Sequence, residues 1–134
     1  KKYQKACFSD DTGLEVSALN NEPGIFSARY AGSGNSEDNM NLLLKNLAGR
    51  KNRKAKFKTV ITFFNEKGES FVFEGIVQGK ITLEKKGTEG FGYDPIFKPN
   101  GFKETFAQMP LHQKTKISHR GIALRKFLTH LISQ

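Results

Sequence analysis

The stretch "KAKFKTVITFFN", from Lys54 to Asn65, alternates in the manner of a β-strand. Successive side chains of a strand point to opposite faces, so small or apolar residues on every second position predict one buried face. After the turn "NEKGE", the stretch "SFVFEGIVQGKITL" returns with Phe71, Phe73 and Val77 on one face, which predicts a long β-hairpin. The buried face of the first strand is expected to hold Ala55, Phe57, Thr59, Ile61 and Phe63.

A helix is predicted on each side of this hairpin. The first is capped by Ser36 and ends at Gly49, and acidic residues at its start suit the positive end of the helix dipole. The second begins near Ser118. Apolar residues recur at helical spacing in both segments. The stripes consist of Met40, Leu43, Leu44 and Leu47 in the first helix and of Leu124, Phe127, Leu128 and Leu131 in the second.

The segment before the first helix is less regular. Ala6–Ser9 and Leu14–Val16 are predicted to be short strands on either side of a bend, and residues 20–36 a loop with one helical turn. Gly75 and Gly79, on the inner face of the hairpin, are expected to permit close approach or a bend. We therefore expect one α/β domain of the mixed α+β kind, in which helices flank a sheet.

Length and charge limit the class of protein. The 134 residues suffice for one domain with a buried core. The net charge of +9 attracts polyanions: nucleic acid, an anionic membrane or a phosphorylated small molecule. The single cysteine, Cys7, and the lack of a long apolar run or an apolar signal sequence predict a cytoplasmic protein without membrane association.

Asp10 and Asp11 are adjacent carboxylates in "FSDDTGLEV", from Phe8 to Val16. Such a pair can hold Mg²⁺, which takes one or two carboxylates together with water and substrate phosphates. Water bound to the ion becomes a better nucleophile. The alternative is a solvated turn, because Asp bends chains readily. Taken alone, the dipeptide favours the turn.

The Gly-rich loop "EGFGYDP" spans Glu89–Pro95. Gly90 and Gly92 allow the backbone to approach a ligand closely. Phe91 is suited to stack on a flat base, and Asp94 to accept hydrogen bonds from the edge of that base. The alternative is a surface loop whose aromatic rings cover the core.

The stretch "QKTKISHRG", residues 113–121, places Lys114, Lys116, His119 and Arg120 around a predicted helix start. Free backbone N–H groups at such a start favour anions, and Arg offers a planar fork to phosphate or carbonyl oxygens. Cations oppose the helix dipole at this end, which hints that a ligand anion compensates them. The alternative is an exposed first helical turn.

The stretch "RKNRKAKFK", from Arg50 to Lys58, contains six basic residues in nine. A nucleic-acid surface is one interpretation. A helix C-terminus, where cations are favoured, followed by the solvent face of a strand is better supported. We therefore expect no nucleic-acid partner.

Three motifs in this order resemble those of the inosine triphosphate pyrophosphatase family, also called XTP/dITP diphosphatases. They are "FSDDTGLEVSALNNEPGIFSARYAG", "EGFGYDPIF" and "KTKISHRGIAL", and the similarity runs from about Phe8 to Leu131. The resemblance implies Mg²⁺-dependent hydrolysis of deaminated purine nucleoside triphosphates (ITP, dITP, XTP) to the monophosphate and pyrophosphate. It also implies an elongated mixed sheet with flanking helices, two lobes around a nucleotide cleft, and a homodimer.

The resemblance implies roles for individual residues as well. Asp11 matches the general base and metal ligand, and Asp10 is its acidic neighbour, expected to support the metal site. His119 and Arg120 match the pair that reads the base. A donor such as Arg120 suits the 6-oxo group of hypoxanthine or xanthine and not the 6-amino group of adenine. The other substrate-binding positions are Thr12, Phe91, Gly92, Tyr93, Asp94 and Lys114, with Ser27 and Arg29 expected to line the cleft.

The chain departs from the family at its start. The family begins with a strand, a Ser/Thr-x-Asn-x-x-Lys phosphate-binding motif and a further Glu ligand, and none of these precedes Asp10 here. We expect a single domain, residues 1–134, that is N-terminally incomplete and leaves an open strand edge. The alternative function is a basic domain that binds nucleotides or nucleic acid without catalysis. The carboxylate pair argues against a nucleic-acid surface, because it would repel a polyanion.

Overall fold

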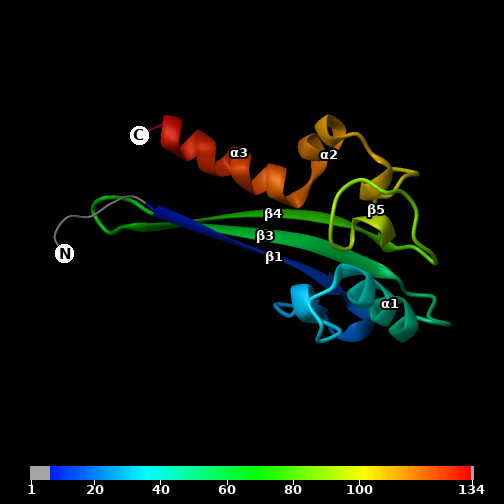
Figure 1. Cartoon of the computed structure of the whole chain (residues 1–134). Coiled ribbons are helices and arrows are strands. Elements are labelled where there is room, and N and C mark those ends of the chain that lie inside the picture. The colour runs from blue at the N-terminus through cyan, green and yellow to red at the C-terminus, as the bar shows by residue number, and fades with distance from the viewer. Residues whose placement is uncertain (1–6, 134) are drawn as a thin grey trace.

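A computed structural model describes residues 7–133 as a long sheet with helices on both sides (Figure 1). Its five strands lie in the order β2-β1-β3-β4-β5, and every pairing is antiparallel. The strands are β1 (Cys7–Val16), β2 (Glu22–Gly24), β3 (Lys54–Phe64), β4 (Ser70–Ile81) and β5 (Phe97–Pro99). The helices are α1 (Ser36–Asn46), α2 (Leu111–Ile117) and α3 (His119–Ile132), with short 3-10 turns η1 (Ser17–Leu19), η2 (Ser27–Arg29), η3 (Asp94–Ile96) and η4 (Phe106–Gln108).

The hairpin of β3 and β4 confirms the alternation seen in the sequence. The five residues expected on the inner face of β3 are all buried. Gly75 lies where α3 crosses β4, and a Cβ atom at this position would be 1.9 Å from the carbonyl oxygen of His119. The predicted close approach is therefore confirmed, because only glycine lets the helix backbone lie directly on the strand.

The predicted bend between two short strands is wrong, because β1 is one continuous strand. Each of its residues has a partner on β3, from Cys7 opposite Phe64 to Val16 opposite Ala55. This uninterrupted ladder outweighs the turn preference of the two aspartates and the glycine. On its other side β1 pairs only through Leu14–Val16. Along residues 7–13 this edge has no partner strand in the described part of the chain, as expected. The predicted Ala6 lies outside the described residues.

Helix α1 begins as predicted, with its cap one residue earlier. The side chain of Asn35, and not that of Ser36, accepts hydrogen bonds from the N–H groups of Glu37 and Asp38, at 2.8 and 3.2 Å. The apolar stripe faces the core as expected, since Met40, Leu43 and Leu47 are buried and Leu44 packs against them.

Helix α3 has the predicted cap, Ser118, but its predicted apolar stripe is mostly wrong. Phe127 is buried, whereas Leu124, Leu128 and Leu131 are each at least 40% exposed. The close approach at Gly75 explains the difference, since a helix lying directly on a strand must present small residues there. The buried face of the helix consists of His119, Gly121, Ala123 and Phe127.

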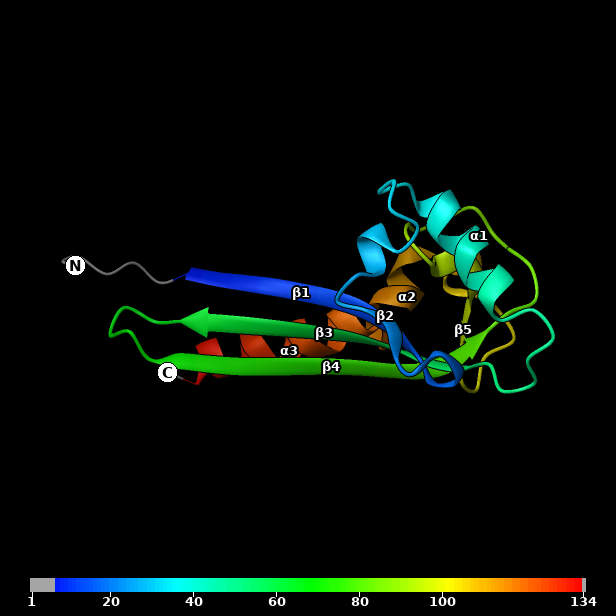
Figure 2. The same cartoon turned by 90° about the horizontal axis from the view of Figure 1, so that it is seen from below.

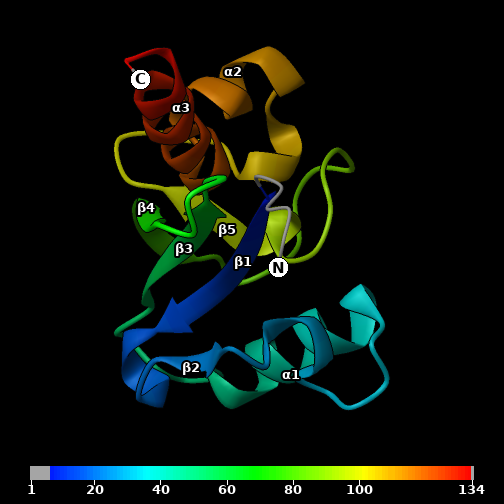
Figure 3. The ribbon, with the colours of Figure 1, turned by 90° about the vertical axis from the view of Figure 1, so that its left-hand side faces the viewer.

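The elements form two lobes on opposite sides of the elongated sheet, as expected, and α3 runs along the sheet (Figure 1). The expected mixed sheet is wrong for residues 7–133, because all of the pairings there are antiparallel. Seen along the sheet, α2 and α3 lie on one side, and α1 and β2 on the other (Figure 3). The main core lies at the end that carries α1 and β5 (Figure 2). A second cluster of Ile61, Phe63, Ala123 and Phe127 joins α3 to β3. None of the helices within residues 7–133 is long and apolar enough to cross a membrane.

Candidate active site

A cavity of about 470 Å³ opens between β1, the loop after β4 and the junction of α2 and α3. Ser27 lines it as expected, whereas Arg29 and Lys116 are exposed and lie outside its lining. The lining contains all eight of the substrate-binding residues predicted from the sequence. These are Thr12, Phe91, Gly92, Tyr93, Asp94, Lys114, His119 and Arg120.

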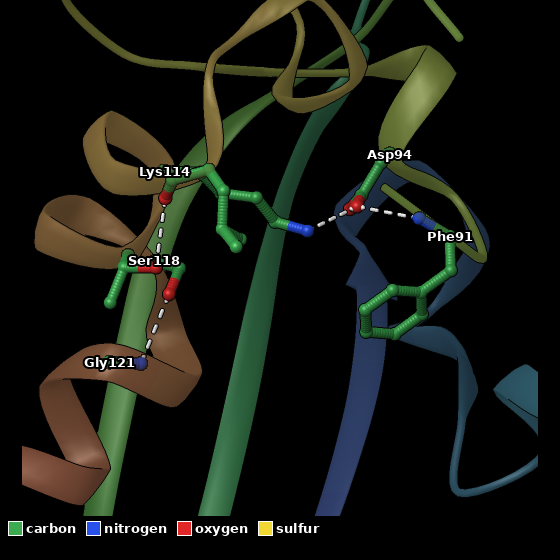
Figure 4. Close-up of polar contacts among 7 residues, drawn as sticks. Phe91, Asp94, Lys114, Ser118 and Gly121 are labelled. Atoms are coloured by element: carbon green, nitrogen blue, oxygen red, sulfur yellow. Dashed lines mark hydrogen bonds and ion pairs between the residues drawn. The ribbon is translucent and has the colours of Figure 1, made fainter. Parts of the chain in front are cut away.

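Asp94 holds the Gly-rich loop and one of the cavity's cations in place (Figure 4). Its carboxylate accepts a 3.0 Å hydrogen bond from the N–H of Phe91 and a 2.5 Å bond from the ammonium group of Lys114. A Cβ atom on Gly90 would lie 2.2 Å from the same carboxylate oxygen, so the glycine makes room for this arrangement. Asp94 therefore positions Phe91 and Lys114 and has much of its hydrogen-bonding capacity already in use.

Phe91 projects an exposed aromatic face beside two cations. Its side chain is 68% exposed although it lines the cavity. The Lys114 ammonium lies 4.8 Å, and the Arg120 guanidinium carbon 5.9 Å, from the ring centroid. Cations at these distances interact with the face of an aromatic ring. The arrangement places a flat stacking surface next to positive charge, which suits an anionic ligand with an aromatic part.

Tyr93 joins the two walls of the cavity. Its hydroxyl donates a 2.7 Å hydrogen bond to the main-chain carbonyl of Ser27. The Ser27 hydroxyl accepts from the N–H of Leu14, at 2.9 Å, and donates to the carbonyl of Gly24, at 2.7 Å. Burial, together with nearby Tyr30, raises the pKa of Tyr93, so its hydroxyl remains a donor. The loop after β4 is thus tied to β1 and β2.

His119 is a buried, uncharged imidazole in the cavity wall. Its ring stacks on Phe57, with centroids 4.5 Å apart. Burial, with smaller contributions from Arg120 and Lys114, lowers the pKa of His119 to about 3. Among residues 7–133 its Nδ1 atom has no hydrogen-bond partner. A neutral imidazole carries one donor and one acceptor nitrogen, so His119 can still bond to a ligand.

The junction of α2 and α3 presents Lys114, His119 and Arg120 to the cavity. Ser118 separates the two helices: its N–H donates to the carbonyl of Lys114 at 2.8 Å, and its side chain accepts from the N–H of Gly121 at 3.0 Å (Figure 4). Sequence reasoning predicted the second helix start and missed α2. At seven residues, α2 is too short to show a periodic apolar stripe.

Asn39 is a cavity residue that sequence reasoning missed. It is buried on α1, where its side chain accepts from the N–H of Ala31 at 2.8 Å and donates to the carbonyl of Ala28 at 3.0 Å. It thereby anchors the segment around η2 to the helix. The available signal was its spacing, because Asn39 lies four residues before Leu43 on the apolar face of the predicted helix.

Asp10 and Asp11 lie beside the cavity and do not line it. The pleat of β1 places them on opposite faces. Asp10 shares a face with Thr12, and Arg120 reaches both, lying 3.9 Å from the Asp10 carboxylate and donating to the Thr12 hydroxyl at 3.2 Å. Asp11 is exposed on the other face. The strand thus separates the two like charges, and Arg120 offsets one of them.

The residues present fit a metal ion that relies on its substrate. No group of three or more His, Cys, Asp or Glu side chains is positioned to hold a metal among residues 7–133. Mg²⁺ commonly takes one or two carboxylates and completes its shell with water and phosphate oxygens. Because Asp10 and Asp11 project from opposite faces of β1, one of them at most can contact an ion at the cavity. The strand thus offers a single carboxylate there, and the described residues form no complete protein cage.

Known proteins resemble this chain in sequence and in structure. Residues 1–130 match the Ham1 family. Relatives named dITP/XTP pyrophosphatase are 57% identical over 129 residues in Flavobacterium johnsoniae and 55% identical over 130 residues in Christiangramia forsetii. The match covers 96% of this chain in both cases, and 67% and 68% of the relatives.

The solved structure of the Staphylococcus aureus Ham1 protein superposes with a TM-score of 0.94 at 44% identity, covering 97% of this chain and 68% of that one. A HAM1 protein from Coxiella burnetii superposes with a TM-score of 0.91 at 37% identity, with the same coverage. The chain thus spans about two thirds of the length of these proteins. The resemblance inferred from the motifs is confirmed, and the chain belongs to the Ham1 family.

Proposed function

We propose that this chain is a nucleoside triphosphate pyrophosphatase that hydrolyses deaminated purine nucleotides (dITP, ITP and XTP) to the monophosphate and pyrophosphate. Family membership and the relatives named dITP/XTP pyrophosphatase support this activity. The observation that carries it is that one cavity gathers an exposed aromatic ring, a neutral imidazole and two cations between the lobes. Such an enzyme removes bases that would mispair from the nucleotide pool.

We propose that the purine stacks on Phe91 and is read by His119 and Arg120. Stacking of a base on an aromatic ring contributes about 1–3 kcal/mol. The guanidinium of Arg120 is a donor only, so it can bond to a 6-oxo group and cannot accept from a 6-amino group. His119 lines the cavity together with Arg120, and its neutral ring carries one donor and one acceptor nitrogen with which to bind a polar group of the base.

On the strength of the resemblance, we propose that Asp11 acts as the general base, although β1 turns its side chain to the face opposite Thr12 and Arg120. Asp11 takes a proton from water while the water oxygen attacks the α-phosphorus, the bond from this phosphorus to the bridging oxygen breaks, and pyrophosphate leaves. Lys114, which also lines the cavity, can offset part of the charge of the phosphates. Mg²⁺ is the cofactor that the resemblance implies, with Asp11 and, less directly, Asp10 as its ligands. Since the two side chains project from opposite faces of β1, only one of them would bind the ion directly, and the ion would supply further positive charge to the phosphates.

A substrate panel tests the activity. Pyrophosphate release is measured with dITP, XTP and dATP in the presence of Mg²⁺. We expect rapid release from dITP and XTP and slow release from dATP. Equal rates with all three would contradict the proposed base recognition, and binding of dITP without release would favour the non-catalytic nucleotide binder.

The two aspartates are tested separately, because they lie on opposite faces of β1. Asp11→Asn should lower kcat by about 100-fold or more, the usual contribution of a general base. Asp10→Asn should act mainly on the Mg²⁺ concentration needed for half-maximal activity. The reverse result, in which Asp10→Asn abolishes turnover and Asp11→Asn does not, would move the base to the face shared with Thr12 and Arg120.

We also propose a homodimer, which the resemblance implies, in the cytoplasm and with no nucleic-acid partner, as expected from the single cysteine and the carboxylate pair. Sedimentation equilibrium of the purified chain tests the dimer directly. A monomer at concentrations that support full activity would contradict it.

A further inference from the structure

A second hollow, of about 860 Å³, lies at the end of the sheet that carries β5. It is formed where β3 begins and β4 ends, together with the loops that follow β4 and β5. It shares no lining residue with the cavity between the lobes. We propose that this hollow binds a small anion that carries several phosphate groups, at a site separate from the nucleotide cavity.

The first support is a row of lysines across three neighbouring strands. Lys54 of β3 lies directly opposite Lys80 of β4, and Lys80 lies directly opposite Lys98 of β5. Directly opposed residues project from the same face of a sheet, and like charges in such pairs are destabilising. We call these three residues the lysine ladder. It spans two inter-strand spacings, or about 10 Å.

No carboxylate among the described residues neutralises the lysine ladder. Within residues 7–133 no ion pair involves any of its three ammonium groups. Six lysines line the hollow, and the acidic residue among them is Glu84. The three lysines outside the ladder, all exposed, are Lys51, Lys86 and Lys103.

The next lysines along the same face of β3 are paired with carboxylates, unlike those of the ladder. Lys56 lies opposite Glu15 of β1 and forms a 3.6 Å ion pair with it. Lys58 forms a 3.6 Å ion pair with Glu74 of β4. The next two outward lysines of β3 after Lys54 are thus neutralised by partners across the sheet. Repulsion is therefore confined to the end that forms the hollow.

The arginine in the hollow is already engaged. Arg53 donates hydrogen bonds to the carbonyls of Leu47, Ile81 and Thr82, at 2.8 to 2.9 Å. It holds the end of α1, the start of β3 and the end of β4 together, and burial lowers its pKa. By contrast, none of the six lysines that line the hollow donates a side-chain hydrogen bond to another described residue. Their ammonium groups are therefore available to a ligand.

The lining favours a compact phosphate-bearing anion over a nucleic-acid strand. Proteins that hold single strands stack bases on aromatic side chains, and no aromatic residue lines this hollow in the part of the chain that the structure describes. The volume of about 860 Å³ falls within the range of small-ligand sites. Ammonium groups are point charges that pair with phosphates without demanding a fixed geometry.

Calorimetric titration of the purified chain with inorganic tripolyphosphate, without Mg²⁺, tests the proposal. The ladder variant is Lys80→Gln with Lys98→Gln. The matched control is Lys56→Gln with Lys58→Gln, which removes the same charge from the same face of the sheet. At about 0.05 M salt, where screening is weak, the ladder variant should lose about tenfold or more in affinity. The control should stay within about threefold.

Three further measurements test whether the effect is specific to the lysine ladder. Without ligand, the ladder variant should melt at the same temperature as the wild type or higher, because repulsion has been removed, and its kcat and KM for dITP should be unchanged. A 20-nucleotide single-stranded DNA should bind more weakly than tripolyphosphate per molecule. The proposal would be overturned if the two variants lost affinity for tripolyphosphate equally, or if the wild type did not bind tripolyphosphate. It would also be overturned if the DNA bound more tightly than tripolyphosphate and the ladder variant lost that binding.

Discussion

The hydroxyl of Tyr93 lies 2.7 Å from the main-chain carbonyl oxygen of Ser27, and this hydrogen bond joins segments 66 residues apart in the sequence. Tyr93 belongs to the loop after β4, and Ser27 to η2 beside β1. The two residues form facing walls of the nucleotide cavity. The width of the cavity therefore depends on a contact between side chain and main chain at its base.

Tyr93→Phe tests this contact. Removing the hydroxyl leaves a buried carbonyl without this partner, which costs about 1–3 kcal/mol. We expect a loss of stability in urea unfolding, together with a higher KM for dITP and a smaller change in kcat. Tyr30→Phe is the control, because its hydroxyl bonds to Asn46 in an exposed contact. Unchanged stability and KM in Tyr93→Phe would show that the walls are held by other contacts.

Asp94→Asn should be among the most destabilising single changes in the site. Asp94 is 4% exposed, and its carboxylate pairs with Lys114. Removing one partner of a buried ion pair leaves the other charge uncompensated and costs about 3–5 kcal/mol. The measurement is the free energy of unfolding in urea.

Glu74→Gln provides the control for Asp94→Asn. It breaks the ion pair with Lys58, in which the Glu74 side chain is 47% exposed, and exposed pairs contribute only about 0.2–1 kcal/mol. Similar losses in the two variants would contradict the bracing role assigned to Asp94.

The sequence predicted the elements whose residues repeat regularly. The alternation along β3 identified its buried face, because each second side chain of a strand meets the same environment. The stripe of α1 was equally informative, since one face of that helix packs on the core. Five of the eight predicted residues that line the cavity were indicated by their side-chain chemistry, and the resemblance of three motifs assigned all eight to a substrate site; periodicity indicated none of them.

Features that depend on contacts between distant segments could not be predicted in this way. The aspartates of β1 suggest a turn, and only pairing with β3 makes the segment a strand. The leucines of α3 form a helical stripe, yet the approach of the helix to Gly75 turns its small residues inward. The lysine ladder is likewise absent from any single segment, because it arises from the register of three strands.

Gly75→Ala should displace α3. The added carbon would lie 1.9 Å from the carbonyl oxygen of His119 and 2.6 Å from the nitrogen of Ala123, both in the main chain. Neither atom can move aside as a flexible side chain would, and overpacking of this kind costs about 1–3 kcal/mol. We expect lower stability and a higher KM for dITP, since His119 lines the cavity. Gln78→Ala, on the outer face of β4, is the control, and wild-type behaviour in both variants would contradict this packing.

The stability of the chain should fall as the pH falls below about 6.5, in part because of His119. In the folded state its pKa is lowered to about 3, whereas in the unfolded chain the imidazole has its ordinary pKa of 6.5. Between these values the unfolded state binds a proton that the folded state does not. The stabilising effect of the neutral ring is therefore complete above pH 6.5 and decreases toward pH 3, by about 2 kcal/mol at pH 5.

His119→Phe isolates this contribution, because phenylalanine keeps a ring against Phe57 and cannot be protonated. Urea unfolding of the wild type and the variant is measured between pH 7.5 and pH 5, above the range in which most carboxylates titrate. The wild type should lose stability relative to the variant across this interval. His112→Gln, a change at an exposed position of α2, should leave the wild-type profile unchanged. Parallel profiles for the wild type and His119→Phe would mean that burial does not lower the pKa of His119 in the folded state.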